Sequence, residues 1–374
     1  MTAKIALPGR PQLCPVPAPE WNLSYPPPKR RSVYAAPHVA AFGDGTIDWE
    51  STMGFREHLW AHGFGVAEAM DTAQRGMGLS VGQARELIAR SGARAAELGA
   101  AIASGAGTDQ LAAAPHSLRE IIEAYAHQLE LVQASGSRVI LMASRALAAS
   151  ARSAADYLEV YGQVLKLADQ PVLLHWLGEQ FDPALRGYWG SADFHGAACT
   201  VLQLIERAGG KVCGIKLSVL DSGSEIWLRR RLPAGVRMYT GDDFSYAELI
   251  RGDAQGHSDA LLGAFAAVTA PAAAALHALD NGDLGGYAAA MGPTVALSRV
   301  IFEAPTYDYK VGIAFLAWLN GLQPCFAMLG RLHERRSTAH LIRVFELAAA
   351  ARALLDPELA VTRMHEYLAR QASA

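Results

Sequence analysis

The sequence predicts a closed (β/α)₈ barrel, and three observations support this fold class. Short apolar segments alternate with amphipathic segments of helical spacing, and eight such pairs lie between Ser32 and Leu279. Regular alternation is typical of parallel strands joined by crossover helices. Eight pairs in about 250 residues match a closed barrel, although a doubly wound open sheet shows the same alternation. Nucleotide-binding signatures are missing, since "GAGTDQ" lacks the last glycine of the dinucleotide motif and "GGKV" is no phosphate-binding loop.

Capping residues and glycines mark the boundaries of the elements. Ser80 precedes a helical repeat, and the first helical segment ends at a glycine, Gly63. Strands are expected within the segments 33–40, 65–70, 100–105, 138–144, 171–178, 212–221, 236–241 and 257–265. Helices are expected within the segments 48–63, 80–99, 117–136, 153–169, 197–210 and 224–232.

Two further regions flank the expected barrel of residues 32–280. Residues 1–31 are rich in proline and predict an extended arm. Residues 281–374 contain amphipathic runs such as "YKVGIAFLAWLNG" and predict a helical region. Apolar helical surface beyond the barrel needs cover, so we expect a homodimer or homotetramer with the arm or these helices at an interface.

The composition argues against several classes of partner. The formal net charge is -3 and the basic runs are short and separate, which argues against a nucleic-acid partner. The four cysteines show no CxxC spacing, which is typical of a reducing compartment and gives no zinc signature. The N-terminal stretch lacks the apolar core of a secretory signal. Residues 260–279 are long enough to span a bilayer, but Pro271 interrupts them, so a strand and a helix are expected instead. These features predict a cytoplasmic protein that acts on small molecules.

A lysine interrupts the apolar strand segment Val212–Asp221. Side chains alternate faces along a strand, so Lys216 shares one face with Gly214 and Ser218, while the opposite face is fully apolar. An edge strand carrying a protective charge is one interpretation. In a barrel, the apolar face meets the helices and Lys216 points inward near the C-terminal end, where active sites lie. A desolvated amine is the nucleophile that carbonyl addition needs, whereas a structural ion pair is the alternative.

The segment "GIKLSVLD" resembles the sixth-strand motif of the dihydrodipicolinate synthase and N-acetylneuraminate lyase superfamily of class I aldolases. Other segments follow in the family's order, among them "FGDGTID", "DTAQRGMGLSVGQARELI", "IASGAGTD" and "TGDDFSYAELI". The resemblance covers most of residues 32 to about 320, and it adds to the barrel prediction. It implies a lyase or aldolase that acts on a 2-keto acid, sugar-derived, through an imine on Lys216. It also implies that no metal or organic cofactor is required, and it marks Ser218 and Gly241 as substrate-binding positions.

Several positions depart from the family pattern. His175 stands where the family has the tyrosine that relays protons, and histidine can move protons near neutral pH. A histidine in a strand is also often a satisfied core residue. On the fourth strand a tyrosine pair is replaced by Ser144 and Arg145. Arg145 suits bidentate binding of an anion, and an arginine in a surface ion pair is the alternative.

The loop after the second strand differs as well. Thr72 matches the first threonine of the family's carboxylate-binding loop, and Ala73 replaces the second. Asp71 and Gln74 replace glycines, and Arg75 replaces a glutamate. The resemblance therefore keeps Thr72 as a catalytic candidate, with Asp71, Ala73 and Gln74 as candidates for substrate binding.

Four more candidates for substrate binding stand at strand ends: His38, Glu179, Asp242 and Asp243. Asp243 matches a position that holds substrate hydroxyls in sugar-acid aldolases of the family, although the two aspartates are also suited to cap the following helix.

Three other functions remain compatible with the sequence. A dehydratase would use the same imine. A barrel isomerase or metal-dependent aldolase would gather His38, Asp71, His175, Glu179 and Asp243 around a divalent ion, although no two of them have diagnostic spacing. A non-catalytic binding protein would keep the fold without activity.

Overall fold

Eight parallel strands form a closed barrel, which confirms the predicted fold class. The computed structural model describes residues 2–70, 74–112 and 114–372. The strands follow one another around the barrel in the order β10-β3-β4-β5-β6-β7-β8-β9. Each lies within one of the eight expected segments, except that β5 extends one residue beyond its segment, to Ala106. They are β3 (Val33–Ala35), β4 (Gly65–Glu68), β5 (Ile102–Ala106), β6 (Arg138–Leu141), β7 (Val172–Leu177), β8 (Val212–Ser218), β9 (Arg237–Thr240) and β10 (Asp259–Leu262).

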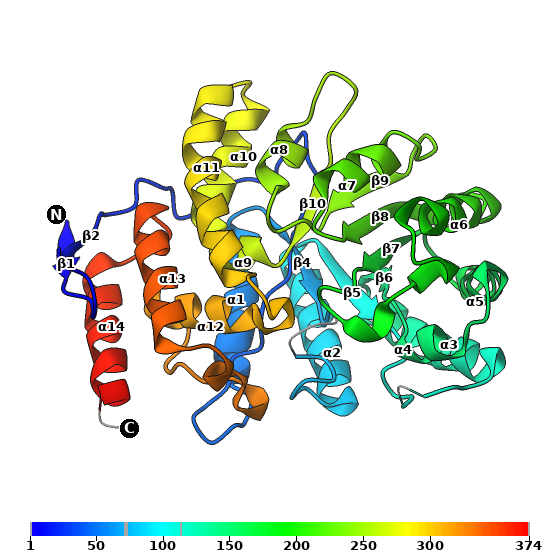
Figure 1. The fold of residues 1–374 in the computed structure, drawn as a ribbon, viewed down its shortest axis with the longest axis horizontal. Helices are drawn as coiled ribbons and strands as arrows, with labels where there is room; N and C mark the ends of the chain where they lie inside the picture. The colour runs from blue at the N-terminus through cyan, green and yellow to red at the C-terminus, as the bar shows by residue number, and fades with distance from the viewer. Residues whose placement is uncertain (1, 71–73, 113, 373–374) are drawn as a thin grey trace. The chain divides into compact units, whose positions relative to one another are not determined.

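The chain divides into two compact units. The first comprises the residues up to Phe64 and those from Gly263 onward, and the second comprises Gly65–Leu262. In the second unit helices lie on the outside of strands β4 to β9 (Figure 1). They are α2 (Val81–Leu98), α3 (Leu118–Ala134), α4 (Arg145–Ser150), α5 (Ala154–Lys166), α6 (Phe194–Arg207), α7 (Ser222–Arg229) and α8 (Tyr246–Arg251), with short 3₁₀ turns at Pro183–Leu185 and Tyr188–Gly190.

Local sequence explains where the helices of the second unit begin. Ser80 and Gln83 form a reciprocal capping box at the start of α2. Ser117 and Glu120 do the same at the start of α3. Such boxes satisfy backbone N–H groups that have no partner inside the helix. These helices therefore start where the capping residues predict.

The first unit contains the flanking regions. Its helices are α1 (Trp49–Ala61), α9 (Ala264–Ala267), α10 (Thr269–Asp280), α11 (Leu284–Ile301), α12 (Lys310–Leu319), α13 (Thr338–Ala350) and α14 (Pro357–Ala372), with 3₁₀ turns at Thr306–Asp308 and Leu329–Arg335. Residues 260–279 contain the end of β10, then α9 and most of α10, as the strand-and-helix interpretation expects. Among the described residues, none of the helices combines the length and apolar character needed to cross a bilayer.

The proline-rich arm belongs to the first unit. It contains an antiparallel pair, β1 (Ala3–Ile5) and β2 (Cys14–Val16), and this pair contacts α13 and α14 (Figure 1). Ile5 and Val16 are buried. Arg10 adds a bidentate ion pair to Glu346. The sequence of the arm does not reveal this pairing, because the two strands are fixed by contacts with helices more than 300 residues away.

Candidate active site

Lys216 lies in the middle of a row of three polar side chains on adjacent strands. In the strand register Lys216 is the direct partner of His175 on β7 and of Tyr239 on β9. Direct partners on parallel strands project to the same face of the sheet. All three residues are buried. The row therefore places an amine between an imidazole and a phenol, away from bulk water.

Two glycines leave space around this row. A side chain at Gly214 would lie 2.7 Å from Cε2 of Tyr239 and 2.9 Å from Cδ2 of Leu173. A side chain at Gly241 would collide with the Ser218 hydroxyl and lie 2.8 Å from Cε of Lys216. The Tyr239 ring thus packs against Gly214 and the Lys216 side chain against Gly241, where any larger residue would collide with them.

Ser218 connects the end of the lysine strand to His175. Its hydroxyl oxygen lies 3.3 Å from Nε2 of His175, and both residues are almost fully buried. Gly241 donates its backbone N–H to the carbonyl of Leu217 at 2.9 Å. Lys216, His175, Ser218 and Gly241, which the sequence singled out separately, are therefore neighbours in the structure.

Asp242 and Asp243 lie in the loop after β9, where Gly241 separates them from the strand, and both are buried. The Oδ1 atom of Asp242 accepts the backbone N–H groups of Phe244 and Ser245. Burial raises the pKa of this carboxyl group above its usual value. Asp242 thus holds the loop between Gly241 and α8, whose N-cap residue is Ser245.

A buried carboxylic acid lies behind this loop. Glu225 accepts a 2.6 Å hydrogen bond from the hydroxyl of Ser258. Burial raises the pKa of Glu225 to about 8. The protonated form of Glu225 is therefore favoured at neutral pH in the folded protein.

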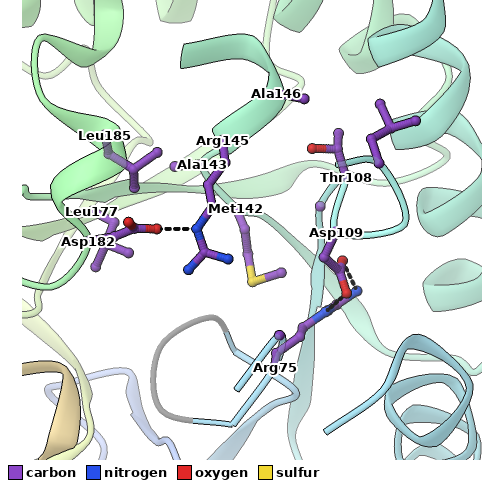
Figure 2. Close-up of a pocket in the computed structure, with 13 residues that line it drawn as sticks. Arg75, Thr108, Asp109, Met142, Ala143, Arg145, Ala146, Leu177, Asp182 and Leu185 are labelled. Atoms are coloured by element: carbon purple, nitrogen blue, oxygen red, sulfur yellow. Dashed lines mark hydrogen bonds and ion pairs between the residues drawn. The ribbon is translucent and has the colours of Figure 1, made fainter. Parts of the chain in front are cut away.

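A pocket of about 230 Å³ lies at the C-terminal ends of β5, β6 and β7 (Figure 2). Arg75 and Arg145 both line it, together with Thr108, Asp109 and Asp182. Active sites of (β/α)₈ enzymes lie at this end of the strands. The pocket is thus in the place where such a barrel binds small molecules.

Arg75 is a structural residue of this pocket. Its Nη1 donates to the carbonyls of Ala69 and Gly105, and its Nε donates to Asp109 at 3.0 Å. Nη2 also donates to Gln128. Burial alone would raise the pKa of Asp109, but the charge and hydrogen bonds of Arg75 outweigh that effect and lower it. Arg75 is thus committed to holding the loop after β4 against β5.

Arg145 is held from one side only. Its Nε donates to Oδ2 of Asp182 at 2.5 Å, and Oδ1 of Asp182 accepts the backbone N–H of Ala184. Figure 2 shows the two terminal nitrogens of Arg145 in the open centre of the pocket. Among the described residues, the ion pair of Arg145 is made through Nε alone, and the outer edge of the guanidinium faces the cavity.

Hydroxyl groups fix the end of β6 next to Arg145. The hydroxyls of Thr108 and Ser144 lie 2.6 Å apart. The Ser144 backbone N–H donates to the Tyr188 hydroxyl at 2.9 Å, and that hydroxyl lies 2.9 Å from the hydroxyl of Tyr161. Burial raises the pKa of Tyr161 and Tyr188 well above the usual value. These tyrosines thus remain neutral and support the start of α4.

The remaining predicted residues lie elsewhere or outside the described residues. Asp71, Thr72 and Ala73 lie outside them, and Gln74, which follows, is buried. Glu179 is half-exposed and lies 3.5 Å from Arg186 in an ion pair.

His38 belongs to the first unit. Its Nε2 lies 2.6 Å from Oε1 of Gln323. Burial lowers the pKa of His38 to about 3, so the imidazole is neutral. His38 is thus a core residue, and its buried Nδ1 has no hydrogen-bond partner among the described residues.

Within the part of the chain that the structure describes, no group of three or more His, Cys, Asp or Glu side chains is arranged to hold a metal ion. The ligand set suggested by the sequence includes Asp71, which lies outside those residues.

Sequence reasoning missed two residues of the site. Tyr239 is hidden in the strand segment "VRMYTG", and only the register between β8 and β9 shows that it is the partner of Lys216. Asp182 lies in the loop after β7, 37 residues from the arginine that it holds. A tyrosine in a barrel strand two residues before the "GDD" segment is a signal that could have drawn attention to Tyr239.

The (β/α)₈ fold of this chain is similar to that of dihydrodipicolinate synthases. The dihydrodipicolinate synthase from Aquifex aeolicus superposes with a TM-score of 0.66 at 14% identity, covering 87% of this chain and 99% of that one. The enzyme from Oceanobacillus iheyensis gives a TM-score of 0.63 at 17% identity, with 86% and 96% covered. The chloride-inhibited enzyme from Acinetobacter baumannii complexed with pyruvate gives 0.63 at 15% identity, with 87% and 100% covered.

The chain itself belongs to the family described as protein of unknown function (DUF993), which it matches over residues 12–372. A search of the curated proteins found no match. The chain is therefore a DUF993 protein, and its similarity to the dihydrodipicolinate synthases is a similarity of fold.

Proposed function

We propose that this protein is a class I lyase or aldolase that acts on a 2-keto acid through an imine on Lys216. The observation that carries the proposal is the row of Lys216, His175 and Tyr239 on three adjacent strands. A buried amine loses its proton more easily than an exposed one, because burial disfavours the charged form. Such an amine adds to a keto group, and loss of water gives the imine.

The protonated imine would serve as the electron sink for breaking or forming a carbon–carbon bond. His175 would move the proton, since it is the strand partner of Lys216 and an imidazole both donates and accepts. Ser218, 3.3 Å from Nε2 of His175, would orient the ring. The lysine itself would then supply the chemistry that other enzymes draw from a cofactor.

Borohydride reduction tests the proposal. The protein is incubated with pyruvate and with a panel of sugar-derived 2-keto acids, then reduced, and its intact mass is measured. Pyruvate is the first choice because one structure of the same fold is a complex with pyruvate. We expect a mass increase equal to one reduced adduct with at least one acid. Lys211→Ala is the matched control, since Lys211 precedes the same strand and donates to the carbonyl of Ala168.

A dehydratase would form the same adduct, so the products of turnover decide between cleavage and loss of water. Tight binding of a keto acid without adduct and without turnover would favour a binding protein instead. Activity that a chelator removes and a divalent metal restores would favour the metal-dependent alternative.

We further propose that the protein is a homodimer or homotetramer. Amphipathic helices beyond the barrel strands and the β1–β2 pair support this proposal. Light scattering at micromolar concentration tests it, and a monomeric mass would contradict it.

A further inference from the structure

One of the two arginines in the pocket at the ends of β5 to β7 has terminal N–H groups with no hydrogen-bond partner among the described residues. Among the described residues, Asp182 is the only recorded hydrogen-bonding partner of the Arg145 guanidinium, and it takes Nε. Arg75, the other arginine of the pocket, is 5% exposed and donates to carbonyls, to Asp109 and to Gln128. The two arginines thus have different roles, and only Arg145 is placed to bind a ligand.

The edge of Arg145 that faces the cavity suits a carboxylate. A guanidinium whose Nε is already engaged can still offer its two terminal N–H₂ groups as a fork, and this fork matches the two oxygens of a carboxylate. The bond to Asp182 fixes the plane of the guanidinium, which reduces the entropy lost on binding. The Arg145 side chain is 37% exposed, so the fork is partly shielded from water, where a charge-assisted bond is stronger than at the open surface.

The charge of the pocket favours a carboxylate over a phosphate. Arg75 is paired with Asp109 and Arg145 with Asp182, so the two ion pairs are neutral together. A monoanion added at Arg145 leaves one excess negative charge, whereas a phosphate dianion leaves two, close to both aspartates. Like charges in a partly desolvated site repel strongly.

The pocket reaches the end of the strand that is paired with the lysine strand. Leu177 lines the pocket, and it stands two residues beyond His175, the strand partner of Lys216. A strand rises about 3.3 Å per residue and neighbouring strands lie about 4.8 Å apart, so the backbones of Leu177 and Lys216 lie roughly 8 Å apart. A chain of several carbon atoms covers this length.

We propose that Arg145 binds a second carboxylate of the substrate, distant from the keto group, so that the substrate class is a 2-keto diacid. This inference rests on the proposed function for the keto end of the molecule. The pocket at the ends of β5 to β7 would then hold the carboxylate at the opposite end of the substrate from the keto group. Asp182 is a positioning residue, since it holds Arg145 and faces no substrate oxygen.

The test measures binding of unreactive acids, which requires no imine. Glutarate and valerate have the same carbon chain and differ by one carboxylate, so calorimetry with the two acids isolates the contribution of that group. We expect the wild type to bind glutarate at least tenfold more tightly than valerate. Arg145→Gln should reduce this preference to less than twofold. Arg186→Gln, which removes an exposed arginine from the loop after β7, should keep it. Thermal melting of each variant checks that it is folded.

The outcomes separate the two proposals. A wild-type preference below twofold, or a preference that survives Arg145→Gln, overturns the diacid assignment. Inorganic phosphate that binds more tightly than glutarate, and that depends on Arg145, replaces the carboxylate by a phosphate and also overturns it. Failure of the imine is seen elsewhere, as the lack of a borohydride adduct with 2-oxoglutarate and with pyruvate. If both acids form the adduct and Arg145→Gln lowers the two adduct yields equally, the imine forms but Arg145 does not bind the second carboxylate.

Discussion

Lys216 and His175 are direct strand partners on β7 and β8, and Ser218 lies within 3.3 Å of the imidazole. Two residues that are 41 positions apart in the chain thus lie side by side in the buried part of the sheet. The pairing places both side chains on the same face of the sheet, and the proposed proton relay needs them within hydrogen-bond reach or one water apart.

His175→Phe is expected to lower kcat about 100-fold or more while leaving the protein folded. Positioned acid–base groups contribute about 10²- to 10⁴-fold to rates. A histidine that transfers the proton makes kcat/KM depend on pH, and this dependence should disappear in the variant. The variant should still form the borohydride adduct, more slowly, because Lys216 remains. An unchanged rate and pH profile would show that His175 is only a core residue.

Tyr239→Phe tests the other neighbour of Lys216. The ring packs over Gly214, so phenylalanine should keep the packing and the melting temperature. If the hydroxyl takes part in imine formation, the rate of adduct formation should fall about tenfold with KM little changed. Equal adduct formation rates in wild type and variant would leave Tyr239 with a packing role alone.

Gly241→Ala is expected to abolish adduct formation by displacing the lysine. The added methyl group would collide with the Ser218 hydroxyl and lie 2.8 Å from Cε of Lys216. Gly162→Ala in α5 is the control, since nothing lies within 4 Å of a side chain at that position. Circular dichroism must show both variants folded. A Gly241→Ala protein that reacts at the wild-type rate would mean that Lys216 does not occupy this position during the reaction.

The fold and the burial of Lys216 could be predicted from sequence, because both depend on local pattern. Period-2 alternation in Val212–Ser218 marks Lys216 as the exception on its strand. The neighbours of Lys216 depend instead on the register between strands, which tertiary packing sets and which single-strand patterns do not reveal. Tyr239 was therefore missed, and the bond from Asp182 to Arg145 joins two loops that the sequence does not relate.

Glu225→Gln is expected to change how stability depends on pH. The pKa of Glu225 is raised by burial from an ordinary value near 4.5 to about 8 in the folded protein. The folded state therefore holds a proton that the unfolded state loses between these two values. Stability should fall as pH rises through this window and level off above about pH 8.

The glutamine variant cannot ionise, so its melting temperature should fall less between pH 5 and pH 9 than that of the wild type. Glu248→Gln, at an exposed site on α8, is the control and should follow the wild type. Parallel curves for the wild type and Glu225→Gln would contradict a buried, neutral Glu225.

Mapping the reduced adduct by peptide mass spectrometry tests the imine mechanism most directly. The protein is reduced with borohydride in the presence of a reactive 2-keto acid, digested, and sequenced by fragmentation. The account predicts that the added mass lies on Lys216, that Lys216→Ala remains folded and gains no mass, and that Lys211→Ala is labelled like the wild type. An adduct on any other lysine, or an equal mass gain in Lys216→Ala, would contradict it.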